Sequence, residues 1–491
     1  MIDGVTTRPL AALLVAVAHA AVNAGQCSAA VRSADYDTSW LAHADKASAW
    51  EVLALPPGHE RAFDHSWGRS AAQLGSDVEG VLLHSFGPRV GGAGPFDRRD
   101  SVLSWDGLRW RQLPLLDTAG DEIPPLGFLK FVDAREGMAG AFYGPDRGFW
   151  SDSGNSGSPA VDEAIEHGLR YYQATSDGWE SVWEIRSDLL CTPVGSWHVP
   201  VLPTWTAVAL HCVDSETDNW SWAGLPVIVA RPPGRDFGEL QFPAPSSDPY
   251  YSGVGHTPAL AELDGRLHAV AVNRQSGSLL VDNCVHDCVY APDGGVVPEC
   301  TTVICLPETQ SRFASVGHDF VVAAAPVVLD GAMWYLLHLQ AFGVALLPPT
   351  GHACSPWALS SDEILAASPT DFHSDWFWFD RVAAAAVNGQ IYLSVASGES
   401  GAGVYPERPD SGWWSGFARF DPGTCTSEWV VADLGSDQGP SWQHTDLALD
   451  RLMSDDAGFL YTIVMKRAIG LEFGYDEPDG WVLRKVHPAL N

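Results

Sequence analysis

The chain has 491 residues, of which 46% are hydrophobic and 18% are charged, and 21 residues are Trp. This composition supplies a large apolar core and excludes a globally disordered chain. The 61 Asp and Glu residues outnumber the 28 Lys and Arg residues, so the formal net charge is −33 at pH 7. Such a surface repels nucleic acids and anionic lipids, and we expect neither as a partner.

The N-terminus resembles a secretory signal peptide. An apolar run over residues 10–22 follows Arg8 and leads to small residues around Ala24. We therefore expect residues 1–24 to be removed on export and residues 25–44 to form an N-terminal extension, the alternative being an N-terminal helix of the mature protein. No later run of eighteen apolar residues is present, so we expect no membrane insertion, a secreted or periplasmic location and a monomer.

A second pattern runs through the rest of the chain, in which two short apolar runs flank a tight polar turn. The clearest copies centre on Asp264-Gly265, Asp330-Gly331 and Asn388-Gly389. Asp-Gly and Asn-Gly pairs tolerate positive φ, so each copy predicts a β-hairpin. Seven such inner hairpins are predicted, near 77–80, 133–137, 207–214, 264, 330, 388 and 457–458.

A Trp-led strand follows a polar turn between these hairpins. The best examples cover residues 104–113, 176–185 and 420–431. We interpret them as outer hairpins whose Trp side chains pack between neighbouring sheets. One inner and one outer hairpin make a four-stranded antiparallel blade, and the spacing of the hairpins favours seven blades, within a range of six to eight.

The two ends of the chain complete this pattern. The last unit has only one clear outer strand, residues 481–486, whereas the segment from Trp50 to Leu55 resembles the outer strand at Trp110. We predict that this N-terminal strand completes the last blade and removes an exposed edge. The predicted fold is therefore an all-β, seven-bladed β-propeller that forms a single domain over residues 45–491. Apart from a short helical turn at 161–167, no helix is expected.

At the level of this repeat pattern the chain resembles the β-propeller superfamily, in its sialidase-like, kelch-like and Trp-rich secreted branches. Ser104-Trp-Asp106-Gly-Leu-Arg-Trp110 is one residue shorter than the Asp-box of sialidases, and no Phe-Arg-Ile-Pro motif is present. The arginine triad of sialidases can therefore not be assigned to residues here. Because propellers serve as enzymes, binding modules and scaffolds, the resemblance implies a fold rather than an activity.

The nine cysteines predict disulfides if the chain is exported. Cys27 is the odd residue, and the candidates for pairing are Cys191, Cys212, Cys284, Cys288, Cys300, Cys305, Cys354 and Cys425. Cys191 and Cys212 flank a strand-like stretch and can pair across neighbouring strands. The four cysteines between 284 and 305 could instead hold zinc, together with His286.

Three segments combine acidic and aromatic residues just before an inner strand. Aromatic planes stack on sugar rings and carboxylates accept hydroxyl hydrogen bonds, so these segments predict a ligand-binding face near the propeller axis. The alternative is that the aromatic residues pack between blades and the Asp residues cap turns. The candidate ligand-binding residues are Asp371, His373, Asp375, Trp376, Trp378, Tyr250, Tyr251, His256, Trp442 and His444.

Two further motifs are candidate metal sites. Histidines recur within or beside inner strands (His84, His211, His268, His338) or just before them (His256, His318, His373, His444). Axial histidines could bind a transition metal such as iron or copper, although a single strand histidine is more often packed. Residues 214–219 resemble part of a calcium loop but lack its Gly and closing carboxylate. No cofactor is therefore predicted, and Ca²⁺ and a His-bound metal stay open.

The segment Gly154–Pro159 resembles the nucleophile segment of glutamyl-endopeptidase-like serine proteases, with Ser156 as the nucleophile. His59, His65 or His84 and Asp117 or Asp133 lie upstream in that family's chain order, but its Thr-x-x-His and Gly-Ile-His-Trp motifs are missing. A Gly- and Ser-rich loop is the simpler interpretation. The function we expect is recognition of an extracellular small molecule or glycan. Glycoside hydrolysis by paired carboxylates on the same face and His-ligated metal oxidoreduction are the alternatives.

Overall fold

The structure is a computed structural model, and its regular elements are β-strands. It describes residues 50–53, 73–77, 80–89, 98–105, 109–113, 115–116, 120, 128–135, 138–144, 169–174, 179–185, 189–192, 202–214, 225–242, 258–273, 284–293, 295, 297–305, 321–339, 343–360, 377–399, 414–431, 444–447, 453–454, 460–467 and 479–485. Within these ranges every regular element is a strand, which confirms the all-β prediction. None of them contains a helix with the length and apolar composition needed to cross a membrane.

The described strands form antiparallel sheets that follow one another along the chain, and we number the sheets in chain order. Sheet 1 contains β2 (Gln73–Asp77), β3 (Gly80–Arg89), β4 (Arg98–Trp105) and β5 (Trp110–Leu113). Sheet 2 contains β7 (Phe128–Arg135), β8 (Met138–Gly144), β9 (Leu169–Ala174) and β10 (Trp179–Ile185), with β6 (Leu115–Leu116) parallel to β10. Sheet 3 contains β11 (Leu189–Thr192), β12 (Thr206–Asp214), β13 (Leu225–Arg231) and β14 (Gly238–Leu240).

The second half of the chain repeats the same order. Sheet 4 contains β15 (Ala259–Leu263), β16 (Arg266–Asn273), β17 (Cys284–Tyr290) and β18 (Glu299–Cys305). Sheet 5 contains β19 (Val321–Leu329), β20 (Ala332–Leu339), β21 (Gly343–Leu347) and β22 (Trp357–Ser360). Sheet 6 contains β23 (Phe377–Val387), β24 (Gln390–Glu399), β25 (Trp414–Asp421) and β26 (Thr426–Val431). Sheet 7 contains β27 (His444–Leu447), β28 (Met453–Ser454), β29 (Leu460–Arg467), β30 (Asp479–Lys485) and β1 (Trp50–Leu53).

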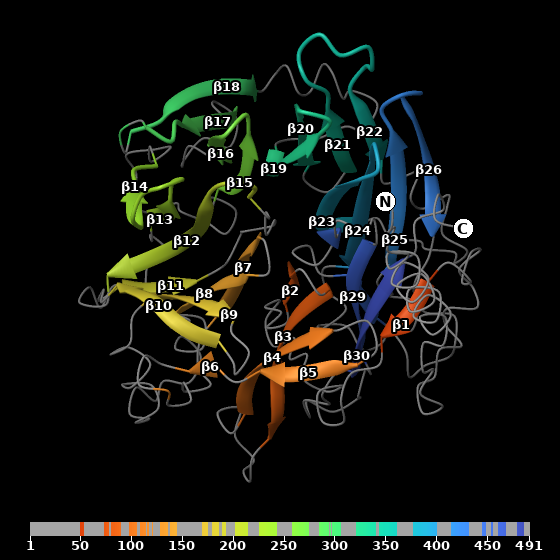
Figure 1. Ribbon diagram of the computed structural model, residues 1–491. Coiled ribbons are helices and arrows are strands. Elements are labelled where there is room, and N and C mark those ends of the chain that lie inside the picture. Colours follow the sequence, from red (N-terminus) through yellow and green to blue (C-terminus); the bar gives the residue numbers. More distant parts are fainter. Residues whose placement is uncertain are drawn as a thin grey trace, which may run out of the picture.

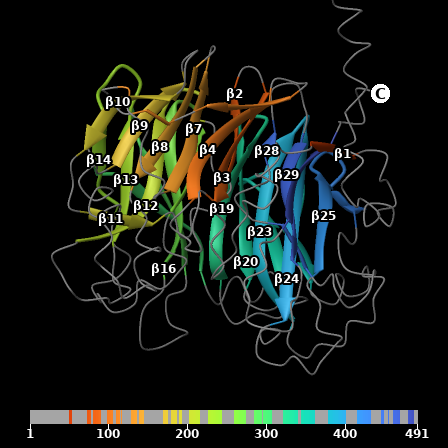
Figure 2. The ribbon, with the colours of Figure 1, turned by 90° about the horizontal axis from the view of Figure 1, so that it is seen from below.

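Neighbouring sheets contact each other around a ring. The first strands meet between sheets 1 and 2 (β2 and β7), sheets 4 and 5 (β15 and β19), and sheets 5 and 6 (β19 and β23). The strand β12 touches β7 and β15, while β28 touches both β23 and β2, which closes the circle. Figure 1 shows β2, β7, β15 and β19 nearest the centre and β5, β10, β14 and β18 at the periphery, and Figure 2 shows the ring from the side. This arrangement is a β-propeller.

Tight turns explain the inner hairpins. Asp264, Asp330 and Asn388 have φ of 51°, 50° and 48°, and the glycines that follow them have φ of 70°, 71° and 76°. Positive φ at both central residues defines the type I′ turn, whose twist matches that of paired strands. Three predicted inner hairpins are therefore confirmed in detail, and the turns predicted near 77–80 and 133–137 also join paired strands, β2 to β3 and β7 to β8.

One predicted inner hairpin is wrong. Residues 207–214 do not turn; they belong to the single strand β12, and the whole strand pairs with β13 or β11. The first strand of sheet 3 is instead β11, and residues 193–205 connect it to β12. This connection has no Asp-Gly or Asn-Gly pair, so the local signal that identified the other hairpins is missing.

The outer hairpins and the closing strand agree with the prediction. The strand pairs β4–β5, β9–β10 and β25–β26 lie where Trp-led hairpins were expected. Strand β1 pairs with β30 in antiparallel register, with Trp50 opposite Lys485 and Leu53 opposite Val482. The first strand in the described part of the chain thus covers the edge of sheet 7, which confirms the predicted pairing of this segment.

The core lies between the sheets, and in sheet 4 both faces of the central strand β16 contribute to it. In β16, Leu267 and Ala269 pack toward sheet 3, whereas Val270 and Val272 pack toward sheet 5. Strands buried on both faces favour long apolar runs with little alternation. Among the side chains that the structure describes, the largest fully buried ones are Trp179, Trp205, Trp334, Tyr171, Tyr172 and Tyr290.

Candidate functional site

The predicted ligand-binding segments lie next to strands that begin sheets 4, 6 and 7. Trp378 lies on β23 opposite Gly398, and His444 begins β27 opposite Arg467. The other predicted ligand-binding residues lie outside the described ranges: Asp371, His373, Asp375, Trp376, Tyr250, Tyr251, His256 and Trp442. What the structure describes is therefore the strand that follows each segment.

The packing between sheets fixes which strand ends share a face of the ring. Val321 at the start of β19 packs in one cluster with Val272 near the end of β16. At the other end of sheet 4, the indole N–H of Trp205, which precedes β12, donates to the carbonyl oxygen of Gly265 in the β15–β16 turn at 3.0 Å. Corresponding strands of sheets 3, 4 and 5 therefore point toward the same face of the ring.

Sheet 6 continues this sense. The Cys354–Cys425 disulfide joins the β21–β22 connection of sheet 5 to the β25–β26 turn of sheet 6. The Trp357 indole N–H also donates to the Ser427 hydroxyl at 2.9 Å. These contacts align the same end of the two outer hairpins, so the first strands of sheets 4, 5 and 6 begin on one face of the ring.

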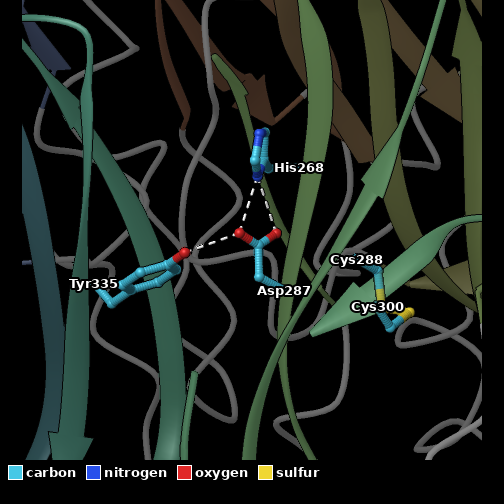
Figure 3. A network of polar contacts seen from close by, with 5 residues as sticks. All are labelled: His268, Asp287, Cys288, Cys300 and Tyr335. Atoms are coloured by element: carbon cyan, nitrogen blue, oxygen red, sulfur yellow. Dashed lines mark hydrogen bonds and ion pairs between the residues drawn. A yellow bond between two sulfur atoms is a disulfide. The ribbon is translucent and has the colours of Figure 1, made fainter. Parts of the chain in front are cut away.

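A buried polar network links sheets 4 and 5. Asp287 on β17 is 3% exposed, and its Oδ2 accepts a hydrogen bond from the Tyr335 hydroxyl on β20 at 2.8 Å. His268 Nδ1 on β16 lies 2.9 Å from Oδ2 and 3.1 Å from Oδ1 of the same carboxylate. Figure 3 shows the carboxylate between the imidazole and the phenol, which approach it from different sides. One carboxylate thus joins three strands from two sheets.

The chemistry of Asp287, His268 and Tyr335 determines which of them donates each hydrogen bond. An ionised carboxylate only accepts hydrogen bonds, so His268 Nδ1 and the Tyr335 hydroxyl are both donors. Burial, followed by the nearby charge of Asp287 and the hydrogen bond to it, raises the pKa of Tyr335 well above its usual value. Tyr335 therefore remains a neutral donor throughout the physiological range, and the network fixes the tautomer and orientation of His268 when its imidazole is neutral.

A second buried carboxylate links sheets 3 and 4. Glu262 on β15 is 8% exposed and accepts hydrogen bonds from the backbone N–H groups of Thr204 at 2.7 Å and Trp205 at 3.0 Å. Its other oxygen accepts from the Thr204 hydroxyl. Both oxygens of the Glu262 carboxylate therefore accept hydrogen bonds from the segment that leads into β12.

Asp287, Tyr335 and Glu262 are functional residues that were not predicted from the sequence. A signal for the two acids exists, because each stands in a strand that is otherwise mostly apolar, Ala259–Leu263 and Cys284–Tyr290. A buried acid in such a strand needs hydrogen-bond partners, and this requirement could have marked both residues. Their partners could not be named, because they come from other sheets.

The four strand histidines do not lie on first strands. His84, His211, His268 and His338 lie on β3, β12, β16 and β20, the second strands of four different sheets. The prediction that they lie within or beside the strands of the inner hairpins therefore holds, and each lies on the second strand of its sheet. In the described ranges no three His, Cys, Asp or Glu residues are grouped so as to hold a metal ion.

The cysteines form disulfides where the structure describes their side chains. Cys284 pairs with Cys305, Cys288 with Cys300 and Cys354 with Cys425, which confirms six of the candidates. The zinc interpretation of the cysteines between 284 and 305 is wrong, because both pairs are oxidised. Cys191 on β11 lies directly opposite Cys212 on β12, as expected of neighbouring strands. Such bonds form in an oxidising compartment.

The remaining motifs lie mostly outside the described ranges. These are the segment Gly154–Pro159 with its upstream His59, His65 and Asp117, the residues 161–167, the calcium-like residues 215–219, and His318 and Cys27. The roles suggested for them remain predictions.

No model of a known protein family matches the sequence, and no curated protein matches it. Solved structures do resemble it. A protein of unknown function from Dyadobacter fermentans is 12% identical, with a TM-score of 0.38, over 89% of this chain and 100% of its own. A puromycin-hydrolyzing peptidase from Mycobacterium tuberculosis is 13% identical, with a TM-score of 0.42, over 86% and 55%. The sialidase of Trypanosoma rangeli is 9% identical, with a TM-score of 0.37, over 78% and 57%.

Proposed function

We propose that residues 45–491 form one seven-bladed β-propeller domain and that this exported domain binds an extracellular glycan. Sheets 1 to 7 would be the blades, with β1 as the outer strand of the last one. The ring of contacts between successive sheets supports this count, as does the pairing of β1 with β30. The three disulfides support export.

One observation carries the proposed binding face. The segments that contain Tyr250, Asp375 and Trp442 each end where a first strand begins, at β15, β23 and β27. The packing of sheets 4, 5 and 6 in one sense supports a common face for the first two segments, and the contact between β23 and β28 brings sheet 7 beside sheet 6. Acidic and aromatic side chains from several blades would then meet near the axis.

The chemistry of these segments favours a sugar over other small molecules. Trp376 and Trp378 offer aromatic planes for the apolar faces of sugar rings, while Asp371 and Asp375 accept hydrogen bonds from hydroxyl groups. The net charge of −33 opposes acidic polysaccharides, so neutral or amino-bearing glycans are the best candidates.

Calorimetric titration with neutral, acidic and amino-bearing oligosaccharides tests the proposal. Trp376→Ala and Asp375→Asn are each expected to weaken binding roughly tenfold, equivalent to about 1.4 kcal/mol. Asp293→Asn is the matched control, because Asp293 is exposed in the β17–β18 turn, at the other end of sheet 4. The proposal fails if no oligosaccharide binds, or if both site variants bind as tightly as the control.

The same carboxylates leave glycoside hydrolysis as the second candidate. A hydrolase needs two carboxyl groups that flank the scissile bond, and Asp371 and Asp375 lie in one segment. Release of reducing sugar that is lost in both Asp371→Asn and Asp375→Asn would assign hydrolysis. Binding without release would leave a recognition module.

A further inference from the structure

The outer hairpin of sheet 4 carries two disulfides side by side. Cys284 lies directly opposite Cys305, and Cys288 directly opposite Cys300, across the paired strands β17 and β18. The two cysteines of β17 are four positions apart, so both face the same side of the sheet. The backbone pairing of the hairpin therefore does not depend on either bridge alone.

The two ends of the Cys288–Cys300 bridge differ in accessibility. Cys300 lies on β18, the last strand of sheet 4, and is exposed together with Glu299, Thr301 and Thr302. Cys288 is 2% exposed and packs in the core between sheets 3 and 4. Thiol–disulfide exchange begins at the sulfur that a thiolate can reach, which makes Cys300 the accessible end.

The buried end of this bridge adjoins the network between sheets 4 and 5. Cys288 follows Asp287 directly, and alternation along β17 places their side chains on opposite faces. Figure 3 shows the bridge on one side of β17 and the carboxylate with His268 and Tyr335 on the other. A change in the position of β17 at Cys288 therefore acts on the contacts of Asp287.

We propose that the Cys288–Cys300 disulfide is a thiol–disulfide exchange site for a dithiol, and that its reduction loosens the contacts of Asp287 with sheet 5. A thiolate of the dithiol attacks Sγ of Cys300 and forms a mixed disulfide. The electron pair of the broken bond leaves on Cys288, which takes up a proton. The second sulfur of the dithiol then attacks the mixed disulfide and releases Cys300 as a thiol. Two electrons and two protons have then passed from the dithiol to the protein.

The surroundings make this exchange reversible. After reduction, β17 and β18 stay paired through their backbone and through the Cys284–Cys305 bridge. The two thiols remain opposite each other, so an oxidised dithiol can close the bond again. The fold is kept in both states, and only the covalent link between β17 and β18 at Cys288 is lost.

Limited reduction of the native protein tests the exchange site. The protein is titrated with dithiothreitol without denaturant, alkylated, and digested for mass spectrometry. Alkylation of Cys288 and Cys300 is expected at least tenfold faster than that of Cys284 and Cys305, which are both half-buried. Equal rates for the two pairs, or protection of Cys288 and Cys300 until the protein unfolds, would overturn the proposal.

Hydrogen exchange tests the coupling to sheet 5. Cys288→Ala/Cys300→Ala is a permanently open form, and Cys284→Ala/Cys305→Ala is its matched control. The open form is expected to exchange several-fold faster in β20, which carries Tyr335, while β9 and β10 of sheet 2 stay unchanged. Wild-type protein after limited reduction should show the same change, which keeps the test valid if the open variant fails to fold. Unchanged exchange in β20 would overturn the coupling.

Asp287→Asn tests whether Asp287 transmits the effect of the Cys288–Cys300 bridge to sheet 5. If Asp287 carries the effect, this substitution alone accelerates exchange in β20, and opening the bridge in the same variant adds little. Full additivity of the two changes would show that the bridge and Asp287 act independently, and would overturn this part of the proposal.

Discussion

Glu262 accepts a 3.0 Å hydrogen bond from the backbone N–H of Trp205, although 57 residues separate them along the chain. The contact joins the first strand of sheet 4 to the segment that precedes β12 of sheet 3. Since the same carboxylate also accepts the N–H of Thr204 at 2.7 Å, one side chain satisfies two backbone donors of a segment without regular structure. This contact adds to the apolar packing that holds sheets 3 and 4 together.

Glu262→Ala is therefore expected to destabilise the protein. It removes the acceptor of the two backbone N–H groups, and for the buried N–H of Trp205 an unsatisfied donor costs about 1–3 kcal/mol. The midpoint of urea unfolding, followed by Trp fluorescence, measures the change. Glu239→Ala is the control, because Glu239 is exposed on β14, and its effect should stay within about 0.5 kcal/mol. Equal midpoints for the two variants would contradict the role of Glu262.

Gly331→Ala tests the conformation of the inner turns. Gly331 has φ of 71°, and an added Cβ would meet no heavy atom within 4 Å, so backbone strain is the only direct cost. A non-glycine residue in this region costs about 1–2 kcal/mol. Gly238→Ala is the matched control, because an added Cβ there also meets open space and its φ is not positive. The thermal midpoint should fall for Gly331→Ala and stay nearly unchanged for Gly238→Ala.

The sequence predicted the fold well where structure depends on neighbouring residues. Asp264-Gly265 forms a type I′ turn through its own backbone preferences, and this preference is visible without any knowledge of the rest of the chain. The connection 193–205 has no such pair, and the prediction placed a hairpin inside β12 instead. The error arose because a long connection between two paired strands does not need a turn-forming pair such as Asp-Gly, so its sequence does not reveal the pairing.

The candidate site was harder to predict, because its contacts join distant residues. His268 was named only among the strand histidines that could bind a metal, whereas its partner Asp287 and the donor Tyr335 come from other strands. Nothing in the sequence around Tyr335 indicates that its hydroxyl meets a carboxylate 48 residues away. Only the pairing of sheets 4 and 5 brings them together.

The disulfide between sheets 5 and 6 should contribute more stability than a bridge within a hairpin. Cys354 and Cys425 are 71 residues apart, whereas Cys284 and Cys305 are 21 residues apart. Because the entropy lost by the unfolded chain grows with the logarithm of loop length, the longer loop adds about 1 kcal/mol. Urea unfolding of Cys354→Ala/Cys425→Ala and Cys284→Ala/Cys305→Ala compares the two. A larger loss for the second pair would contradict the entropic account.

The pKa of Tyr335 predicts how stability depends on alkaline pH. Burial raises this pKa in the folded state above the value of about 10 of an exposed Tyr. Above pH 10 the unfolded chain therefore loses this proton while the folded protein keeps it, and the free energy of unfolding falls as pH rises. Tyr335→Phe removes the titrating group, so its stability should fall less steeply between pH 9 and pH 11. Parallel curves for the variant and the wild type would contradict the assignment.

The lowered pKa of His286 predicts how stability depends on acidic pH. It lies on β17 between the two cysteines, with Nδ1 3.4 Å from the Thr302 hydroxyl oxygen, and burial lowers its pKa from 6.5. When the pH falls below 6.5, the unfolded chain binds a proton at this residue before the folded protein does, so the free energy of unfolding decreases. His286→Gln keeps a polar side chain but cannot titrate, and it should flatten the decrease between pH 7 and pH 5. Urea unfolding at several pH values measures the slope. If His286→Gln keeps the wild-type slope, the acid sensitivity arises elsewhere and the neutral form of His286 does not contribute to stability.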